Sequence, residues 1–532
     1  MTGAPTFPER FNLADYLLGA GVSGARDGVA RGGRTAVFCG GARWSYDEVE
    51  AMACRAGNAL RGLGVGPEQR VLIVLPDGIE FVATWLGTLK IGAVFAMANT
   101  IHTADDYLYY LDYTRAPVAV IHESVLDRFE AVAARARHLR ALLVVGAHGR
   151  HLGFEREVGR CPDQMETADT SRDDVAGWLF TSGSTGQPKA AVHFHRDFAY
   201  NIETYARQVL RMSPDDVTVS VPKLFFGYAT GTNLMFPFSV GAATALFPDR
   251  CTPENVFEMI ERHHPTVLTS VPTMINAMLA ADPKGSRRHL MAGLRVCISA
   301  GEALPAELYR RWVDTFGVEI LDGIGSAEMF HIYISNRFGE VRPESLGRLV
   351  PGYEARIVDP AGNEVPPGEQ GTLWVKGGST ALCYWQRRES SRETFRGDWC
   401  VTGDQFARDA DGYFYYRGRT DDMLKVSGIF VSPLEIEDCL LGHPAIREVA
   451  VVGQNDENGL TKPKAYVALA EGKEATRELA FELKGFVKDR LSPYKYPRWI
   501  EFVESLPRSD RGKVLRTHLR DGVKGILDVN LS

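Results

Sequence analysis

Thr181-Ser-Gly-Ser-Thr-Gly-Gln-Pro-Lys189 is the stretch of this chain that says most about its fold and chemistry. It follows the apolar run Gly177-Trp-Leu-Phe180 and combines hydroxyl side chains, flexible backbone and a cation. Gly183 and Gly186 allow backbone N–H groups to approach an anion closely, and Lys189 adds a positive charge. Further hydroxyl donors in the stretch are Ser182, Ser184 and Thr185. The stretch therefore predicts a loop that binds a polyphosphate.

This loop differs from a Walker A motif, in which a serine or threonine follows Gly-Lys and reaches the metal ion. Here Pro188 precedes Lys189 and Ala190 follows it. On composition alone, a solvent-exposed Ser/Gly-rich turn would be the simpler interpretation. The Pro-Lys ending and the apolar entry favour phosphate binding instead.

Composition restricts the class of protein. The chain has 532 residues, of which 45% are hydrophobic and 24% charged, and a formal net charge of −7. A chain of this length exceeds one ordinary hydrophobic core, so two or more domains are expected. The mild charge, with both signs interspersed, argues against a nucleic-acid or anionic-membrane partner.

The cysteines and the N-terminus indicate a cytoplasmic protein. The eight cysteines form no C-x-x-C pair, which argues against a zinc site or a disulfide framework and for a reducing compartment. Residues 1–20 carry Glu9, Asp15 and early prolines in place of a basic start and a long apolar core. No apolar run approaches the length of about 18 residues expected of a membrane span.

Short β-rich runs alternate with helical patterns along the chain. Such alternation is typical of α/β layers with largely parallel sheets. Between two of the runs, residues 79–92 have the apolar spacing of a helix, so a βαβ unit is expected. The predicted strands are residues 70–75, 93–97, 118–121, 142–145, 217–221, 266–270 and 294–298.

The loop at 181–189 resembles the phosphate loop of the adenylate-forming superfamily of acyl-CoA synthetases, luciferases and peptide-synthetase adenylation domains. The resemblance implies that a carboxylate attacks the α-phosphate of ATP, giving an acyl-adenylate and pyrophosphate, and that a thiol then captures the acyl group. It also implies a large N-terminal domain, with a small β-barrel-like part, and a small mobile C-terminal α/β domain. A change of sequence character after residues 419–422 places these domains at 1–420 and 421–532.

A second motif, Leu321-Asp-Gly-Ile-Gly-Ser-Ala-Glu328, resembles the Tyr-Gly-x-Thr-Glu motif of the superfamily. The resemblance makes Glu328 a ligand of Mg²⁺ on the ATP phosphates, a role suited to a hard oxygen donor. Ile324 replaces an aromatic residue that often stacks on adenine, and Ala327 replaces a threonine that contacts the α-phosphate. Other nucleotide-binding positions implied by the resemblance are Thr181, Gly301, Glu302, Ala303, Asp322 and Gly323.

Two later segments complete the family pattern. By resemblance, Asp404 of Trp399–Asp404 binds the ribose hydroxyls with the help of Arg419, and Asp421 is the hinge about which the small domain rotates. For the second half-reaction, with coenzyme A, the resemblance points to Lys425, Ser427 and Gly428. An ordinary solvent-exposed loop lysine is an equally good interpretation of Lys425.

Leu506-Pro-Arg-Ser-Asp-Arg-Gly-Lys513 resembles the segment whose lysine enters the active site during adenylation. Lys513 would bind the attacking carboxylate and offset charge developing on the α-phosphate. Together with Glu328 and Lys189 it makes up the expected catalytic set.

The segment Pro222–Gly231, together with Ser299–Pro305 and Met329–Ile332, looks most like the benzoate-CoA ligase branch. Residues 225–230 also lack the aspartate that, in adenylation domains for amino acids, pairs with the substrate amine. A flat, mostly apolar slot for an aromatic ring is expected. Its predicted lining is Phe226, Gly227, Tyr228, Ala300, Gly323, Gly325, His331 and Ile332. Gly227, at a position expected to be alanine in benzoate ligases, would leave room for an ortho or meta group, and His331 could bind that group. Ordinary core aromatics and a pocket histidine with satisfied nitrogens are the alternatives.

The expected substrates and cofactors are therefore ATP, Mg²⁺, coenzyme A and benzoate or an ortho-substituted benzoate such as 2-aminobenzoate. Two alternatives remain: an adenylating enzyme that loads a carrier-protein phosphopantetheine, and a non-catalytic binding module. The intact set of Lys189, Glu328, Asp404, Arg419 and Lys513 argues against the binding module. The histidine pair His193 and His195 has no third ligand at a plausible spacing, so no metal role is assigned to it. A monomer or a homodimer is expected.

Overall fold

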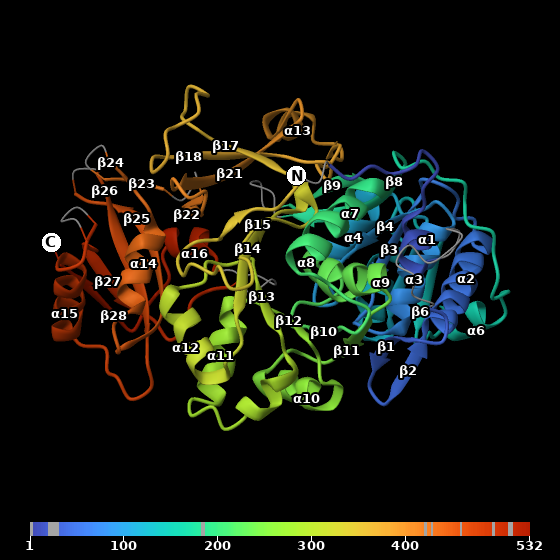
Figure 1. Ribbon diagram of the computed structural model, residues 1–532, viewed down its shortest axis with the longest axis horizontal. Coiled ribbons are helices and arrows are strands. Elements are labelled where there is room, and N and C mark those ends of the chain that lie inside the picture. Colours follow the sequence, from blue (N-terminus) through green and yellow to red (C-terminus); the bar gives the residue numbers. More distant parts are fainter. Residues whose placement is uncertain are drawn as a thin grey trace.

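The computed structural model is a mixed α/β protein with a large N-terminal domain and a small C-terminal domain, which lies at the left in Figure 1. The structure describes residues 4–19, 31–181, 187–419, 423–426, 429–457, 460–491, 495–508 and 514–531. All seven strands predicted above are present, each to within two residues at either end. Within the described ranges no helix is long and apolar enough to cross a membrane.

The first sheet of the large domain has eight strands in the order β19-β9-β8-β4-β3-β5-β6-β7. From β8 to β7 all neighbouring strands are parallel, whereas β9 and β19 are added antiparallel at one edge. The central strands read as continuous apolar runs because both faces of the sheet are covered. The strands are β3 (Arg70–Val74), β4 (Val94–Met97), β5 (Val118–His122), β6 (Ala141–Val145), β7 (Leu152–Gly153), β8 (Val175–Thr181), β9 (Lys189–Phe194) and β19 (Cys383–Tyr384).

The second sheet has nine strands in the order β16-β15-β14-β13-β12-β10-β11-β1-β2. Its middle, from β14 to β1, is parallel, and antiparallel strands close both ends. The strands are β1 (Thr35–Cys39), β2 (Ala42–Ser45), β10 (Val217–Ser220), β11 (Ala243–Leu246), β12 (Val267–Ser270), β13 (Val296–Ser299), β14 (Ile320–Gly325), β15 (Ile332–Ser335) and β16 (Arg348–Leu349).

Helices cover both sheets of the large domain. The α-helices are α1 (Leu13–Leu18), α2 (Tyr46–Gly62), α3 (Ile79–Lys90), α4 (Ala104–Thr114), α5 (Leu126–Ala133), α6 (Phe154–Gly159), α7 (His195–Asn201), α8 (Gly227–Thr230), α9 (Phe236–Val240), α10 (Pro253–His263), α11 (Pro272–Ala281), α12 (Ala306–Phe316) and α13 (Arg388–Thr394). Two π-helical stretches are η2 (Ile202–Val209) and η3 (Gly231–Met235), and three 3₁₀ turns are η1 (Glu123–Val125), η4 (Arg288–Gly293) and η5 (Ala327–Met329).

The packing of α2 on α3 shows how sequence sets these positions. Ser45 caps α2 and forms a capping box with Glu48, which satisfies backbone donors at the helix start. Where the two helices cross, a Cβ atom on Gly87 would lie only 2.7 Å from the carbonyl oxygen of Ala53 and from the amide nitrogen of Gly57. Glycine at this position therefore permits the close approach of the two helix backbones.

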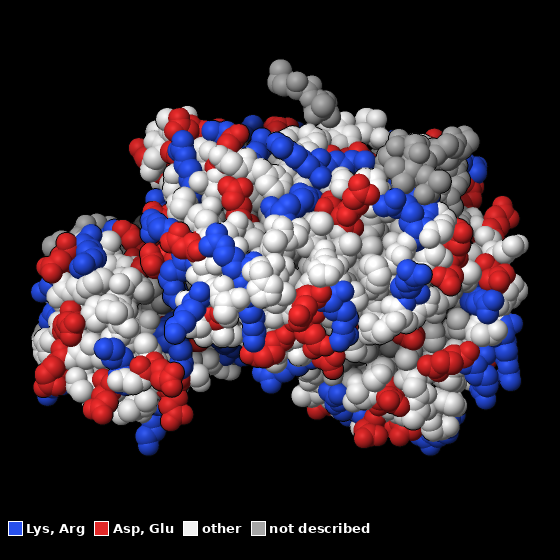
Figure 2. All heavy atoms as spheres, turned by 60° about the horizontal axis from the view of Figure 1, so that its bottom comes forward, with Lys and Arg blue, Asp and Glu red and all other residues white. Residues whose placement is uncertain are grey.

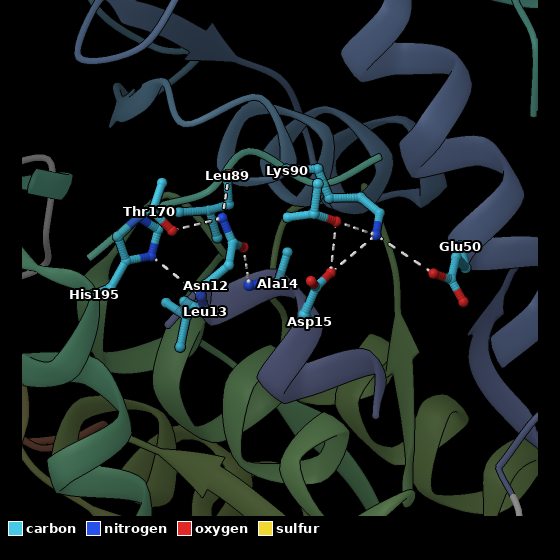
Figure 3. Close-up of polar contacts among 10 residues, drawn as sticks. Asn12, Leu13, Ala14, Asp15, Glu50, Leu89, Lys90, Thr170 and His195 are labelled. Carbon is cyan, nitrogen blue, oxygen red and sulfur yellow. Dashed lines mark hydrogen bonds and ion pairs between the residues drawn. The ribbon is translucent and has the colours of Figure 1, made fainter. Parts of the chain in front are cut away.

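A buried charged network fixes the N-terminal helix α1 to this packed region (Figure 3). Lys90, at the end of α3, has a side chain only 2% exposed, and its Nζ lies 3.1 Å from Asp15 Oδ1 and 3.4 Å from Glu50 Oε1. It also donates a 3.1 Å hydrogen bond to Thr167 Oγ1. Burial lowers the pKa of Lys90, but the ion pairs outweigh burial and hold that pKa above its ordinary value. Lys90 therefore remains charged at the centre of the network.

The start of α1 is held by neutral polar groups next to this network (Figure 3). Asn12 caps the helix through Ala14 N, and its Nδ2 donates to the carbonyl oxygen of Leu89 at 2.8 Å. His195 Nδ1 accepts a 3.1 Å hydrogen bond from Leu13 N. Burial lowers the pKa of His195 to about 3, so its ring is neutral and able to accept this bond.

A third sheet, of five antiparallel strands, forms the smaller β part of the large domain. It pairs in the order β17-β18-β21-β20, and β22 also pairs with β21. The strands are β17 (Glu354–Val358), β18 (Gln370–Lys376), β20 (Phe395–Arg396), β21 (Trp399–Arg408) and β22 (Phe414–Arg419).

The small domain has hydrophobic cores of its own, built from residues between Leu424 and Leu531. Its main sheet has the order β25-β26-β27-β28. The elements are β23 (Leu424–Val426), β24 (Ile429–Val431), α14 (Pro433–Leu441), β25 (Ile446–Asn455), β26 (Thr461–Leu469), α15 (Arg477–Lys488), β27 (Trp499–Phe502), α16 (Arg516–Arg520) and β28 (Leu527–Asn530). The predicted domain boundary at 420/421 lies outside the described residues and stays a prediction.

Candidate active site

A cleft of about 3660 Å³ lies between the large and small domains and continues into the large domain. It opens at the ends of β8, β13 and β14, where connecting loops of α/β sheets commonly form ligand sites. Every described residue predicted to bind the nucleotide or the acid lines this one cleft. Those residues are Thr181, Lys189, Phe226, Gly227, Tyr228, Ala300, Gly301, Glu302, Ala303, Asp322, Gly323, Ile324, Gly325, Glu328, His331, Ile332, Asp404 and Arg419.

Lys189 and Glu328 share a partner that sequence reasoning missed, Tyr384. Lys189 pairs with Thr181 where β8 and β9 form a hairpin, and its Nζ lies 3.7 Å from the centre of the Tyr384 ring. The hydroxyl of Tyr384 donates a hydrogen bond to Glu328 Oε1. Burial lowers the pKa of Lys189, and the nearby carboxylate of Glu328 opposes this shift. One tyrosine therefore orients a cation and a carboxylate at the same wall of the cleft.

The turn that carries Glu328 is fixed from behind by His193. Its Nε2 donates a 2.7 Å hydrogen bond to the carbonyl oxygen of Ala327, and its Nδ1 lies 3.2 Å from Asp197 Oδ2. Burial raises the pKa of Asp197, partly offset by His193. Within the part of the chain that the structure describes, no group of three His, Cys, Asp or Glu side chains is placed to hold a metal ion. His193 is thus a structural support for the Glu328 turn.

Asp404 and Arg419 face each other on the neighbouring strands β21 and β22. Arg419 Nη1 donates to Asp404 Oδ1 at 3.0 Å and to the carbonyl oxygen of Thr402 at 2.9 Å. Asp404 is only 7% exposed, and Arg419 places an opposite charge directly beside it. The pair presents an anchored carboxylate to the cleft.

Asp322 and the loop after β13 form a second polar wall. Asp322 is buried at the end of β14, beside Ser299, and burial raises its pKa to about 8. Its Oδ1 has no hydrogen-bond partner among the described residues. Next to it, Gly301 has a φ of +91°, which glycine adopts without strain, and Glu302 accepts hydrogen bonds from both the amide and the hydroxyl of Thr273.

The predicted acid slot is formed where α8 approaches β15. Tyr228 donates from its hydroxyl to the carbonyl oxygen of Ser270 at 3.3 Å. His331 Nε2 lies 3.0 Å from the carbonyl oxygen of Tyr228, and because that oxygen can only accept, Nε2 carries the proton. Burial lowers the pKa of His331 to about 4, so the ring is neutral. Its Nδ1 is consequently a buried acceptor with no described protein partner.

Glycines in β14 permit close pairing with β15 beside the predicted slot. A Cβ atom on Gly323 would lie 2.7 Å from the carbonyl oxygen of Ile334, and one on Gly325 would lie 2.6 Å from the His331 backbone. Neither position tolerates a side chain. A Cβ atom on Gly227 would lie 3.3 Å from the Leu179 side chain and 3.7 Å from the carbonyl oxygen of Phe330, so that position admits a methyl group after a small shift of Leu179.

Several predicted site residues lie outside the described parts of the chain. They are Ser182, Gly183, Ser184, Thr185 and Gly186 of the phosphate loop, Asp421, Ser427, Gly428 and Lys513. For Lys425 the backbone position in β23 is described, but the side chain is not.

The fold and the residues of this cleft define the class of protein. A model of the AMP-binding enzyme family matches residues 25–385, and one of the AMP-binding enzyme C-terminal domain matches residues 435–513. The chain therefore belongs to the AMP-binding enzyme family.

Three proteins to which the chain is similar are named as ligases of benzoate or anthranilate. It is similar to the benzoate–CoA ligase of Thauera aromatica, with 44% identity over 96% of each chain. A solved structure of the anthranilate CoA ligase AuaEII in complex with anthranoyl-AMP superposes with a TM-score of 0.92, at 38% identity, covering 97% of this chain and 98% of that one. A benzoate CoA ligase from Burkholderia xenovorans LB400 gives a TM-score of 0.88, at 41% identity, covering 96% and 100%.

Proposed function

We propose that this protein is an AMP-forming aryl-acid–CoA ligase. It activates an aromatic carboxylic acid with ATP to an aryl-adenylate, releases pyrophosphate and transfers the aryl group to coenzyme A. The observation that carries the proposal is that Tyr228 and His331 line the same cleft as Lys189, Glu328 and Asp404. The eight cysteines are all free thiols, which supports a cytoplasmic location.

The substrate proposed for the slot is benzoate or an ortho-substituted benzoate such as 2-aminobenzoate. Phe226 and Tyr228 line the cleft together with Gly323 and Gly325, and this mixture of aromatic and small residues suits an aromatic ring. Gly227 leaves space at its edge. The anthranilate ligase structure among the relatives adds support for an ortho amino group.

In the proposed adenylation step, the loop from Thr181 to Lys189 holds the departing pyrophosphate. Lys189 supplies positive charge there, and Tyr384 keeps the Lys189 ammonium beside the Glu328 carboxylate. Asp404, anchored by Arg419, accepts hydrogen bonds from the ribose hydroxyls. Adenine contacts are assigned to the segments 301–303 and 322–324, where Asp322, with its raised pKa, offers a polar edge.

Glu328 is the proposed protein ligand of Mg²⁺. A carboxylate oxygen is the type of donor that this hard cation prefers, and the cation commonly takes only one or two carboxylates beside phosphate and water oxygens. Glu328, oriented by Tyr384, supplies one such carboxylate at this wall. When bound, the ion neutralises charge on the phosphates.

Lys513 is the proposed catalytic lysine of the first half-reaction, where it binds the attacking carboxylate. Rotation of the small domain about Asp421 would then bring Lys425, Ser427 and Gly428 to the cleft for the reaction with coenzyme A. These roles follow from the sequence motifs.

The test is pyrophosphate release measured with ATP and a panel of acids: benzoate, 2-aminobenzoate, 2-hydroxybenzoate, 4-coumarate and octanoate. The proposal predicts the highest kcat/KM for benzoate or an ortho-substituted benzoate. Octanoate as the best substrate would overturn the aryl-acid assignment. Adding coenzyme A should yield the aryl thioester, whereas transfer only to a carrier-protein phosphopantetheine would favour the alternative adenylating enzyme.

A further inference from the structure

The segment that carries Lys513 is closed at its base by a narrow β-bridge. Arg508 and Val514 pair as an isolated antiparallel bridge, and Leu515 N donates a 2.8 Å hydrogen bond to the carbonyl oxygen of Pro507. Residues 509–513 lie outside the described residues, and the bridge fixes the positions of the two residues that flank them in the sequence. We call residues 507–508 and 514–516 the neck.

One side of the neck is tied to the small domain itself. Arg516 Nη2 contacts both carboxylate oxygens of Glu437, at 2.5 and 2.6 Å. Glu437 is only 6% exposed, and its Oε1 also accepts a 2.6 Å hydrogen bond from Val451 N. A buried carboxylate with these two partners is a rigid anchor. The neck therefore moves with the small domain.

The other side of the neck reaches across to the large domain. Arg508 Nη1 donates a 3.2 Å hydrogen bond to Thr273 Oγ1, at the start of α11, and lies 4.0 Å from Glu302 Oε1. Thr273 in turn donates to Glu302 Oε2 at 2.7 Å. Glu302 belongs to the segment 301–303 that lines the nucleotide side of the cleft. Arg508 thus joins the lysine-bearing segment to the nucleotide wall.

Both halves of this contact keep a partner if the domains separate. Arg508 Nη2 also donates a 3.1 Å hydrogen bond to Glu448, which lies in the small domain and would travel with it. Thr273 and Glu302 remain bonded to each other in the large domain. The side chains of Arg508, Glu302 and Glu448 are 20–28% exposed. Separating them therefore leaves no unpaired charge buried away from water. The contact is therefore suited to being broken and remade.

We propose that Arg508 is a positioning residue that docks the lysine-bearing segment on the large domain for adenylation and releases it for thioester formation. This rests on the two-step reaction proposed above. The guanidinium contacts neither ATP nor the acid in this role. It holds the base of the segment at the nucleotide wall so that Lys513 enters the cleft. Loss of Arg508 should then slow the first half-reaction and spare the second.

The experiment measures the two half-reactions separately in Arg508→Met, which removes the charge and keeps an apolar side chain of similar reach. We expect ATP–pyrophosphate exchange to fall about 10- to 100-fold in kcat with little change in the KM for ATP. Thioester formation from a supplied aryl-adenylate should stay within about twofold of wild type. Thr273→Val should slow exchange more weakly, and should add nothing when combined with Arg508→Met, because both remove the same contact. Equal loss of both half-reactions, or an unchanged exchange rate, would overturn the proposal.

Arg262→Met is the matched control, because Arg262 forms an exposed ion pair with Glu258 within α10, away from the cleft. It should leave both half-reactions unchanged. Hydrogen exchange of the unliganded protein gives a readout that does not depend on which acid is used. Peptides covering Thr273 and Glu302 should lose protection in Arg508→Met and not in Arg262→Met. Unchanged protection would count against the docking contact, whereas a wild-type enzyme inactive on every aryl acid would count only against the proposed function.

Discussion

The Lys90 network and the neck around Arg508 both join distant parts of the chain through a charged side chain, and they differ in burial. Lys90 is 2% exposed and has three polar partners from three different segments. The Arg508 side chain is 27% exposed and bridges two domains. It has a second partner, Glu448, within its own domain, and Thr273 and Glu302 are bonded to each other in the large domain. On the face of the molecule drawn in Figure 2, Lys and Arg side chains are interspersed with Asp and Glu side chains.

The difference in burial separates two tasks. Removing one member of a buried ion pair leaves the others without solvent or partner, which is costly, whereas a partly exposed pair contributes about 0–1 kcal/mol. A buried network therefore fixes the fold, and an exposed one selects between arrangements of the domains. The following predictions test that separation, from the largest expected effect to the smallest.

Lys513→Ala should strongly slow the first half-reaction without reducing stability. Adenylation, measured as pyrophosphate exchange, should fall by about 10²–10³-fold in kcat, the usual effect of removing one preorganised charge from a transition state. Thioester formation from a supplied aryl-adenylate should be spared, and the thermal midpoint should stay the same. Loss of both half-reactions in a folded variant would contradict the assignment of Lys513.

Lys90→Met should reduce stability and leave activity nearly unchanged. It leaves Asp15 and Glu50 without their shared cation, and because both carboxylates keep some solvent exposure we expect a loss near the lower end of the range for buried pairs, about 3 kcal/mol. Urea titration would measure it, with Arg262→Met as the exposed-pair control. The variant that remains folded should keep its kcat within about twofold. A large fall in kcat would show that the network also supports the site.

Acid should weaken the same packed region through His195. The pKa of its ring is lowered to about 3 in the folded chain, so below the unfolded value near 6.5 only the unfolded state gains the proton. Stability is therefore lost as pH falls, by about 2 kcal/mol for this group between pH 7.5 and pH 5.

His195→Asn isolates that contribution, because the Asn oxygen can accept the Leu13 N–H bond and does not titrate. His331 has the same sign and remains in both proteins, so the difference in pH slope belongs to His195. Identical slopes in urea titrations at pH 5 and 7.5 would argue against a neutral anchor at this position.

Gly227→Ala should give the smallest effect, confined to substrate choice. The nearest neighbour of the added methyl group is the Leu179 side chain, at 3.3 Å, so the fold should tolerate the methyl group. The space beside the aromatic ring of the substrate should shrink. We expect kcat/KM for 2-aminobenzoate to fall about 10-fold relative to benzoate. An unchanged ratio of the two values would place the ortho group elsewhere in the slot.

The parallel strands of the first sheet were the part of the fold that the sequence predicted best. The strands around residues 70–145 are almost continuous apolar runs, so their existence and their succession along the chain could be inferred from local pattern alone. The order in which strands pair could not, because β3 lies between β4 and β5, and only tertiary packing decides such neighbours.

The site was predicted where motifs are local. Lys189, Glu328 and Asp404 were each picked out from a short sequence motif, and all three line one cleft, while their roles stay predictions. Tyr384 was missed because it follows Glu328 by 56 residues and stands in a two-residue strand without any motif of its own. Arg508 lies inside a recognised motif, but its partner Thr273 is 235 residues away, and nothing in the sequence links the two.

The anchors of α1 have a consequence for how the chain is made. The helix spans Leu13–Leu18, yet the ring that accepts its Leu13 N–H belongs to His195, 182 residues further along the chain. At a synthesis rate of about 5–20 residues per second, roughly 10 to 40 s pass between the two residues on the ribosome. During that interval the start of α1 lacks its His195 anchor, although Leu89 and Lys90 of α3 have already been made and can hold it. The helix is therefore fully anchored only after α7 has been synthesised.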